Sequence, residues 1–209
     1  MAKALSIPNI QARIERVKQL RNESRGKQAN QNASSPHKFV FAPHTDDISI
    51  VVPRHFSEKR EFLTVGLLNG KHQVIADSAS AIYRATLIDF SILSSKLHFV
   101  WIDTVAGRIK SDYRYSSTLV WNTFPIPLLT NKNREDLAIC AKEILVARER
   151  YFPATIADLY DPENMPEDLL RAHERNDEVL ERIYIGRRFK NDTERLHKLF
   201  DLYTQLSLK

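Results

Sequence analysis

Long hydrophobic runs are missing from this chain of 209 residues. The longest uninterrupted apolar stretch, 137–141, is far shorter than the roughly 20 residues that a membrane-spanning helix needs. The first residues carry charges and contain no apolar stretch of signal-peptide length. With one cysteine, Cys140, neither an intrachain disulfide nor a cysteine-based zinc site can form. We therefore expect a cytoplasmic protein in a reducing compartment, with no membrane partner.

Sequence signatures of catalysis are absent as well. Only five glycines occur, and neither GxGxxG nor GxxxxGK[ST] is present as a phosphate-binding motif. The seven histidines show no metal-ligand spacing, and the string from His44 to Asp47 is interpreted as a turn. Cys140 lies in an apolar helical stretch and is expected in the core. The chain is therefore predicted to hold no catalytic residue, no metal and no cofactor of its own.

Positive charge is distributed unevenly along the sequence. The net charge is +5, yet residues 1–130 contain 17 Lys and Arg against 10 Asp and Glu, whereas residues 131–209 contain 14 against 16. A basic front part favours contact with a polyanion such as nucleic acid. The alternative interpretation is that a modest positive charge only keeps the protein in solution.

The N-terminal residues have the pattern of an amphipathic helix over 6–19. Apolar residues recur there at helical spacing, Ser6 can cap the helix, and Pro8 lies in the first turn, where a missing N–H is tolerated. Residues 23–38 contain almost no apolar side chains and are predicted to be a linker or an exposed loop. The helix is either a spacer that joins this piece to another part or the first helix of the domain.

Strand patterns come next in the sequence. Residues 48–52 are rich in β-branched side chains, and a second apolar run covers 62–68. Asn69-Gly70 is a strong hairpin signal before a third strand at 72–76. The pattern predicts three strands, at least two of them antiparallel.

Helical periodicity returns over residues 86–105, and Gly107 is predicted to end that helix. Residues 118–121 have the composition of a short strand. Residues 131–209 are helical throughout, with three amphipathic helices, the third of them capped by Asp192. The expected fold class is α+β: a small mixed or antiparallel sheet with helices, followed by an all-helical C-terminal subdomain.

This pattern divides the chain into an N-terminal helix and linker (1–38), a recognition domain (39–130) and a helical subdomain (131–209). The helical subdomain is predicted to be structural, with its apolar stripes packed on the recognition domain. We expect Leu199 and Phe200 to be buried there.

Two basic segments, 54–61 and 107–117, are the remaining candidates for function. Arg and Lys contact phosphates, Arg grips guanine, Asp accepts from the cytosine amino group, and Tyr stacks on a base. The alternative is that Tyr113 and Tyr115 pack half-buried and that the charged side chains are only solvated. The predicted DNA-binding residues are Arg54, Ser57, Lys59, Arg60, Arg108, Lys110, Asp112, Tyr113, Arg114 and Tyr115.

Several long strings carry a family resemblance. They are VPRHFSEKREF (52–62), LSSKLHFVWIDTVAGR (93–108), SDYRYSSTLVWNTFPIP (111–127) and a tail at 144–184 that contains ADLYDP. Together these strings resemble the target-recognition domain and the helical C-terminal region of MmeI-like DNA methyltransferases, which are type IIG restriction–modification enzymes. The resemblance covers about residues 5–208.

This resemblance implies a DNA-reading module that lacks its catalytic core. Family members methylate an adenine amino group with S-adenosylmethionine, through a glycine-containing cofactor motif and an Asn-Pro-Pro-aromatic motif, and neither motif occurs in this chain. The chain is thus expected to correspond to the C-terminal third or quarter of such an enzyme. Its expected partners are double-stranded DNA and the methyltransferase core of the parent polypeptide.

By the same resemblance, base choice depends on side chains in and just before GRIKSDYRYS, where alternation around a turn exposes Arg108, Lys110 and Asp112. Trp121 stands where the family often has tyrosine, a change that conserves shape. One alternative is a stand-alone specificity subunit of a type I-like system, although two recognition domains would be expected there and one is visible. Another is a non-catalytic protein-interaction module whose basic face is incidental.

Overall fold

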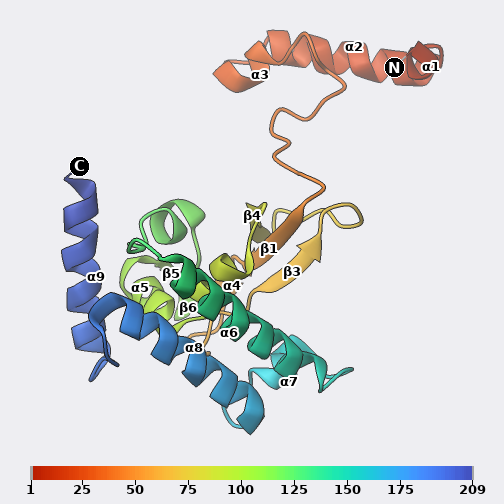
Figure 1. Cartoon of the computed structure of the whole chain (residues 1–209). Coiled ribbons are helices and arrows are strands. Elements are labelled where there is room, and N and C mark those ends of the chain that lie inside the picture. Colours follow the sequence, from red (N-terminus) through yellow and green to blue (C-terminus); the bar gives the residue numbers. More distant parts are fainter. Residues whose placement is uncertain (1, 209) are drawn as a thin grey trace. The chain divides into compact units, whose positions relative to one another are not determined.

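The computed structural model describes residues 2–208, and the chain folds as two compact units, 1–44 and 45–209 (Figure 1). The N-terminal unit is helical. Its helices are α1 (Ala2–Leu5), α2 (Pro8–Asn22) and α3 (Lys27–Gln31).

Helix α2 begins one residue later than a Ser6 cap would place it. Its N-cap is Ile7, which provides no side-chain cap, and Pro8 occupies the first turn as predicted. The Ser6 hydroxyl instead donates to the Lys3 carbonyl at 2.9 Å, so the predicted Ser6 cap is wrong. No residue of α2 is fully buried within the described part of the chain; Ile10 and Leu20 are exposed, and Ile14 and Val17 are half-buried.

The predicted linker 23–38 has structure of its own, because it contains α3 and folds back on α2. Arg21 holds this turn together by donating to the carbonyls of Asn32, Ser35 and Lys38 at 3.0, 2.9 and 2.7 Å. The guanidinium thereby satisfies carbonyl groups that lie outside any regular element.

The larger unit starts with an antiparallel sheet of order β3-β1-β4. Its strands are β1 (Ile48–Pro53), β3 (Gly66–Asn69) and β4 (Ala79–Tyr83). Strand β1 is confirmed, whereas the second strand is shorter than predicted and the hairpin after it is wrong. Residues 72–76 form no strand, and the next strand, β4, pairs with β1 rather than β3.

Gly70 explains the failed hairpin. Its N–H donates to the Asp47 carbonyl at 3.1 Å, and a Cβ at this position would lie 2.0 Å from the Thr45 carbonyl oxygen. The glycine therefore serves a close backbone approach across the sheet edge, not the turn of a two-residue hairpin.

The single helix predicted over 86–105 is two helices, α4 (Leu87–Leu93) and α5 (Lys96–Val105). Ser95 caps α5 by accepting from the His98 N–H, and its hydroxyl donates to the Ile92 carbonyl. Such local side-chain bonds compete with a continuous helix and favour a break. Thr86 and Asp89 form a reciprocal capping box at the start of α4.

A second antiparallel sheet has the order β2-β6-β5. Its strands are β2 (His55–Phe56), β5 (Gly107–Ile109) and β6 (Asp112–Arg114). The strand predicted at 118–121 is wrong, because a π-helical turn, η1 (Ser117–Trp121), occupies this place. It buries Val120 completely, so tertiary packing overrides the strand preference of its residues.

Four helices complete the larger unit (Figure 1), in which α6 packs against α4 and α8, and α9 packs against α5. They are α6 (Asn131–Glu149), α7 (Ile156–Leu159), α8 (Glu167–Ile185) and α9 (Asp192–Ser207). The predicted α+β class is confirmed, with one short helix more than expected. Asn191, not Asp192, caps α9 by accepting from the Glu194 N–H at 2.9 Å. Within residues 2–208 no helix combines the length and apolarity for crossing a membrane.

One hydrophobic core runs through the larger unit, from β1 through α4 and α5 to α6, α8 and α9. Cys140 and Leu199 are buried in this part of the chain as predicted. Phe200 is not, because 42 % of it remains exposed and its ring packs against Trp101 with centroids 5.3 Å apart. The prediction that Phe200 is buried is wrong.

Because Leu199 is buried and Phe200 is partly exposed, the two residues should contribute differently to the free energy of unfolding. We expect Leu199→Ala to lower the free energy of unfolding by about 2–5 kcal/mol, because it leaves a cavity in the core. Phe200→Ala should cost about 1 kcal/mol, the scale of one partly exposed aromatic contact. Urea denaturation of both variants measures the difference, and equal losses would contradict this account of α9.

Candidate nucleic-acid interface

The second sheet brings together the two basic segments that are far apart in sequence. Strand β6 lies between β2, from the 54–61 segment, and β5. His55 pairs with Arg114 and Phe56 with Tyr113 on one side of β6, and Arg108 pairs with Tyr113 on the other. The candidate residues thus belong to one small structure.

Lys110 stands at the tip of the β5–β6 hairpin in a rare backbone conformation. Its φ is 58°, and Lys110 and Arg84 are the non-glycine residues with positive φ in the described part of the chain. Left-handed backbone costs a residue with a side chain about 1–2 kcal/mol, so the surrounding pairing must enforce it. The turn holds Lys110 and Ser111, both exposed, between the paired residues Ile109 and Asp112.

Arg108 links the hairpin to neighbouring residues through hydrogen bonds and a ring contact. Its guanidinium donates to Asp103 Oδ1 at 2.6 Å and to the Ser111 carbonyl at 2.9 Å, and it lies 4.2 Å over the Tyr113 ring. The Tyr113 hydroxyl donates to the same Asp103 oxygen at 2.6 Å. Burial raises the pKa of Tyr113, so this hydroxyl keeps its proton. Asp103, on α5, therefore ties the hairpin to a helix.

Buried aromatic side chains pack against the second sheet. Tyr113 and Tyr115 are 5 % and 3 % exposed, which removes both rings from direct stacking on a ligand. Tyr113 stacks on Phe56 with centroids 5.0 Å apart and meets Phe99 edge-on. The Tyr115 hydroxyl lies 3.2 Å from His98 Nε2, and burial lowers the pKa of His98 to about 3, so this histidine is neutral.

Three predicted residues on the hairpin point their charge outward. Lys110, Asp112 and Arg114 are exposed, and none of them has a side-chain hydrogen bond or ion pair within residues 2–208. They are the hairpin residues whose donors and acceptors are available to a ligand.

Side chains of the other predicted segment, 54–61, form more contacts within the protein. Arg54 forms an ion pair with Asp77 at 3.0 Å, and Arg60 donates to the Ala157 carbonyl of α7 at 3.1 Å. The Ser57 hydroxyl accepts from the Lys59 N–H at 3.3 Å, while the exposed Lys59 ammonium has no partner in the described chain.

Sequence reasoning missed two residues of this site. His55 is exposed directly across from Arg114, and Asp103 is the carboxylate that orients Arg108. Asp103 lies five residues before Arg108, across a helix end, and no regular spacing links those positions. Only the hairpin geometry reveals the pairing.

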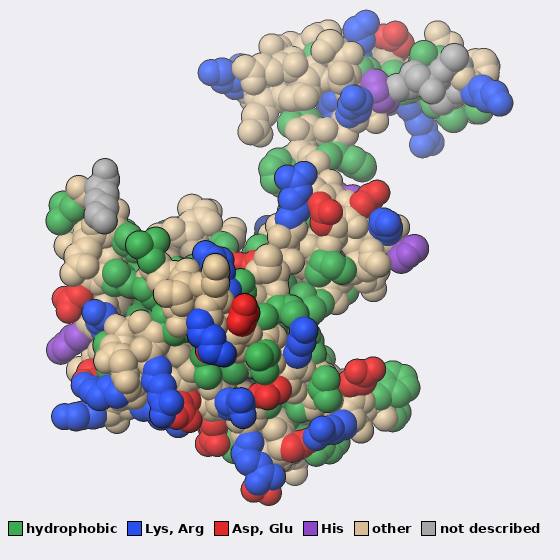
Figure 2. All heavy atoms as spheres, viewed as in Figure 1, with side chains coloured by type: hydrophobic (Ala, Val, Ile, Leu, Met, Phe, Trp, Pro, Cys, Tyr) green, Lys and Arg blue, Asp and Glu red, His purple; other side chains and the backbone are tan. Residues whose placement is uncertain are grey.

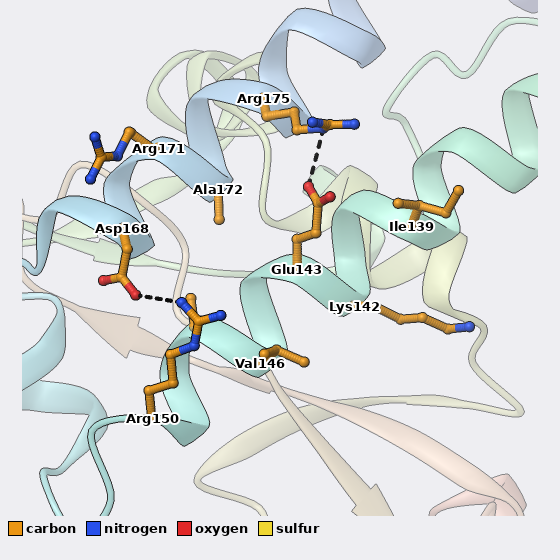
Figure 3. Close-up of a pocket in the computed structure, with 10 residues that line it drawn as sticks. Ile139, Lys142, Glu143, Val146, Arg150, Asp168, Arg171, Ala172 and Arg175 are labelled. Atoms are coloured by element: carbon orange, nitrogen blue, oxygen red, sulfur yellow. Dashed lines mark hydrogen bonds and ion pairs between the residues drawn. The ribbon is translucent and has the colours of Figure 1, made fainter.

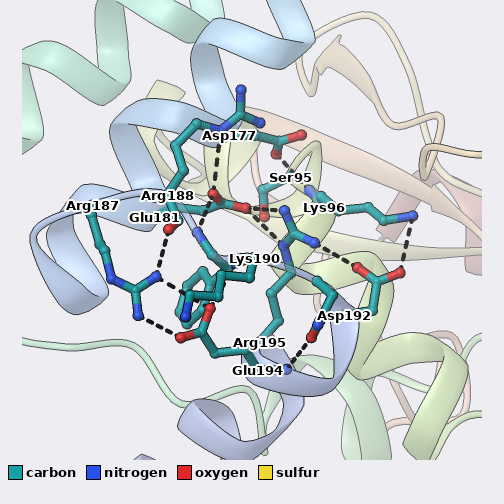
Figure 4. A network of polar contacts seen from close by, with 12 residues as sticks. Ser95, Lys96, Asp177, Glu181, Arg187, Arg188, Lys190, Asp192, Glu194 and Arg195 are labelled. Atoms are coloured by element: carbon teal, nitrogen blue, oxygen red, sulfur yellow. Dashed lines mark hydrogen bonds and ion pairs between the residues drawn. The ribbon is translucent and has the colours of Figure 1, made fainter.

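A polar network connects residues of α5, α8 and α9 (Figure 4). Glu181 of α8 is fully buried and accepts from Arg195 Nε at 2.7 Å and from the Phe189 N–H at 3.0 Å. Asp192 pairs with Arg195 and, at 3.8 Å, with Lys96 of α5. The network thus joins α8 and α9 to the helix that carries Asp103.

A groove of about 450 Å³ lies elsewhere, between the outward faces of α6 and α8 (Figure 3). Two ion pairs lie within its lining, Arg150 with Asp168 and Arg175 with Glu143, both at 3.2 Å. None of its lining residues belongs to the hairpin. Within residues 2–208 no three His, Cys, Asp or Glu side chains gather as a metal site would require.

Two family descriptions together match the whole chain. The family description "MmeI, target recognition domain" matches residues 1–128, and "MmeI, C-terminal domain" matches residues 129–209. DNA methyltransferase A of Bacillus subtilis (strain 168) is 40 % identical over 205 residues, which are 98 % of this chain and 23 % of that protein.

A solved structure shares the fold. The type IIL restriction–modification enzyme MmeI, determined in complex with DNA, superposes with a TM-score of 0.80 at 33 % identity, over 98 % of this chain and 27 % of that one. The chain therefore spans about a quarter of the length of the relatives it matches. The chain belongs to the MmeI family and comprises its target recognition domain and its C-terminal domain.

Proposed function

We propose that this chain is the sequence-reading part of a DNA methyltransferase of a restriction–modification system, one that acts on an adenine amino group. One observation carries the proposal: a braced β5–β6 hairpin presents unpaired charges within a region matched by a target recognition domain. A relative solved with DNA supports double-stranded DNA as the partner. We retain the predicted segments 1–38, 39–130 and 131–209.

The hairpin suits base reading in the major groove, which is about 12 Å wide and admits a two-stranded ribbon. The Lys110 ammonium is a donor for guanine O6 and N7, and the Asp112 carboxylate is an acceptor for the cytosine amino group. Arg114 and Lys59 serve phosphates or bases from the flanks, with Arg54, Ser57 and Arg60 beside them.

Arg108, Tyr113 and Tyr115 act by positioning. The ion pair of Arg108 with Asp103 and the burial of both tyrosines hold the hairpin rigid, which keeps its readers in register with the base edges. In this proposal the tyrosines do not touch DNA.

Catalysis is assigned to the remainder of the parent polypeptide, in the cytoplasm. That part would bind S-adenosylmethionine and take the adenine out of the base stack. This chain would determine which adenine is presented, because docking of the hairpin sets the register on the duplex.

We expect Lys110→Ala and Asp112→Ala, each placed in the full-length enzyme, to relax the methylated sequence at one base pair. A lost base contact removes about 1–3 kcal/mol of discrimination, or roughly 5- to 150-fold. Methylome sequencing measures this directly. The exposed Arg182, paired with Glu178 on α8, gives a control variant, Arg182→Ala, that should keep the parental motif.

Arg108→Ala should behave differently from both, because it frees the whole hairpin. Its expected result is lowered stringency at several positions. If Lys110→Ala and Asp112→Ala both retain the parental motif at full stringency, the hairpin does not read bases, and Lys59 with its neighbours becomes the next place to test.

The isolated chain is expected to transfer no methyl group. Neither a cofactor motif nor an adenine-binding motif is present in its sequence. Labelled S-adenosylmethionine with mixed duplex DNA should give background incorporation only. Turnover by the purified 209-residue chain would show that catalysis resides here.

A further inference from the structure

Positive charge is concentrated in one of the two units. Residues 1–44 contain eight Lys and Arg and two Asp and Glu, a net charge of +6. Residues 45–209 contain 23 and 24, a net charge of −1. The unit that carries the reading hairpin is thus close to neutral, and the excess charge of the protein lies in the short N-terminal unit.

The two units also differ in how their charges are paired. Every ion pair within residues 2–208 joins two residues of the larger unit. Arg21 is occupied by three backbone carbonyls. The remaining cations of the N-terminal unit are exposed without a carboxylate partner in the described chain: Lys3, Arg13, Arg16, Lys18, Arg25, Lys27 and Lys38.

Figure 2 shows the same contrast on the viewed face. In the larger unit, blue Lys and Arg side chains stand beside red Asp and Glu side chains. In the N-terminal unit, blue side chains are distributed around the helices with little red among them. Arg13 and Arg16, three residues apart on α2, lie on the same side of the helix.

We propose that the N-terminal unit, residues 1–44, binds the phosphate backbone of DNA and supplies most of the sequence-independent affinity of the chain. Unpaired cations displace the counterions of DNA on binding, whereas a cation already paired with a carboxylate gains little. The near-neutral larger unit then reads bases without holding DNA tightly at every sequence. This inference rests on the proposed function, since it assumes duplex DNA as the ligand.

The test compares two triple variants of the 209-residue chain by fluorescence anisotropy with a labelled duplex over a range of salt concentrations. One variant is Arg13→Ala, Arg16→Ala, Lys18→Ala in the N-terminal unit. The control removes the same charge from ion-paired, exposed cations of the larger unit: Lys132→Ala, Arg171→Ala, Arg182→Ala.

The N-terminal variant is expected to reduce the slope of log affinity against log salt by up to about 2.7, or 0.9 for each lost phosphate contact. At 0.1 M salt this corresponds to roughly 8-fold weaker binding for each contact, equally for every duplex sequence. The control variant should keep the parental slope. Circular dichroism verifies that both variants retain their helices.

The outcomes separate this inference from the proposed function. If the parent chain binds DNA and both variants lose the same affinity, binding follows net charge, and the assignment to residues 1–44 is wrong. An unchanged slope in the N-terminal variant also overturns it, while leaving the DNA-reading role intact. A parent chain that binds no duplex at any salt concentration overturns both.

Discussion

Replacing Arg148 by alanine should lower the free energy of unfolding by about 2–4 kcal/mol, because two buried hydrogen-bond partners lose their donor at a cost of about 1–3 kcal/mol each. Arg148, on α6, is 8 % exposed and has no ion-pair partner in the described chain. Its Nε donates to the Tyr160 hydroxyl and its Nη1 to the Val65 carbonyl, both at 2.7 Å. The guanidinium also lies over the rings of Phe90 and Tyr160.

The expected loss is large because the bonds form a directed chain. The Tyr160 hydroxyl accepts from Arg148 and therefore donates to His173 Nε2 at 2.7 Å. The remaining His173 nitrogen, Nδ1, then carries the proton and donates to the Ser94 carbonyl at 3.2 Å. Without the guanidinium, the Val65 carbonyl is left buried and unpaired, and Tyr160 loses its donor.

A matched control lies two residues away on the same helix. Arg150 is exposed and pairs with Asp168, so Arg150→Ala should cost at most about 1 kcal/mol. Urea denaturation with an unchanged m-value measures both losses. A loss below about 1 kcal/mol for Arg148→Ala would mean that water replaces the guanidinium and that this network does not hold α6, α7 and α8 to the recognition part.

Local sequence patterns account for the elements whose partners are near in sequence. Helices α6, α8 and α9 form where apolar side chains recur at helical spacing, and β1 follows from its β-branched run. Lys110 and Asp112 are exposed as predicted, although alternation is not the reason, because every residue from 107 to 112 is exposed.

Contacts between distant segments account for the errors. The pairing of His55 with Arg114 joins strands almost sixty residues apart, and no local pattern encodes it. Tyr113 and Tyr115 have the composition of a stacking platform, yet the sheet places them over Phe99 and His98 in the core. The helical spacing of apolar residues does not distinguish Phe200 from Leu199 either. Both lie near the packed face of α9, and only Leu199 reaches the core.

The protein is expected to lose stability in acid, because two buried histidines resist protonation. Burial lowers the pKa of both His98 and His173 to about 3, against an ordinary value of 6.5. Below pH 6.5 both histidines bind a proton in the unfolded chain but stay neutral in the folded protein. The free energy of unfolding therefore falls as pH falls toward 3. Each histidine contributes a slope of up to about 1.4 kcal/mol per pH unit.

The pKa shift of Asp177 has the opposite effect on the free energy of unfolding. Burial raises the pKa of this carboxyl from 3.8 to about 7, and its Oδ1 accepts from the Lys96 N–H at 2.6 Å. Between pH 7 and 3.8 the folded protein therefore binds a proton that the unfolded chain releases, and this contribution grows as pH falls. One carboxyl thus offsets one of the two histidines, which leaves a net slope of about 1.4 kcal/mol per pH unit.

Asp177→Asn should remove that compensation while its side-chain oxygen still accepts from Lys96. We expect the variant to lose about 5 kcal/mol of stability between pH 6.5 and 4.5, roughly twice the loss of the parent chain. Hydrogen bonding with Arg187 lowers the pKa of Glu194 from 4.5 to about 2, so this carboxylate is lost only below the window. Urea midpoints measured across the window give the two profiles. Parallel profiles would show that Asp177 stays ionised in the folded protein, with Lys96 and the neighbouring arginines stabilising its charge.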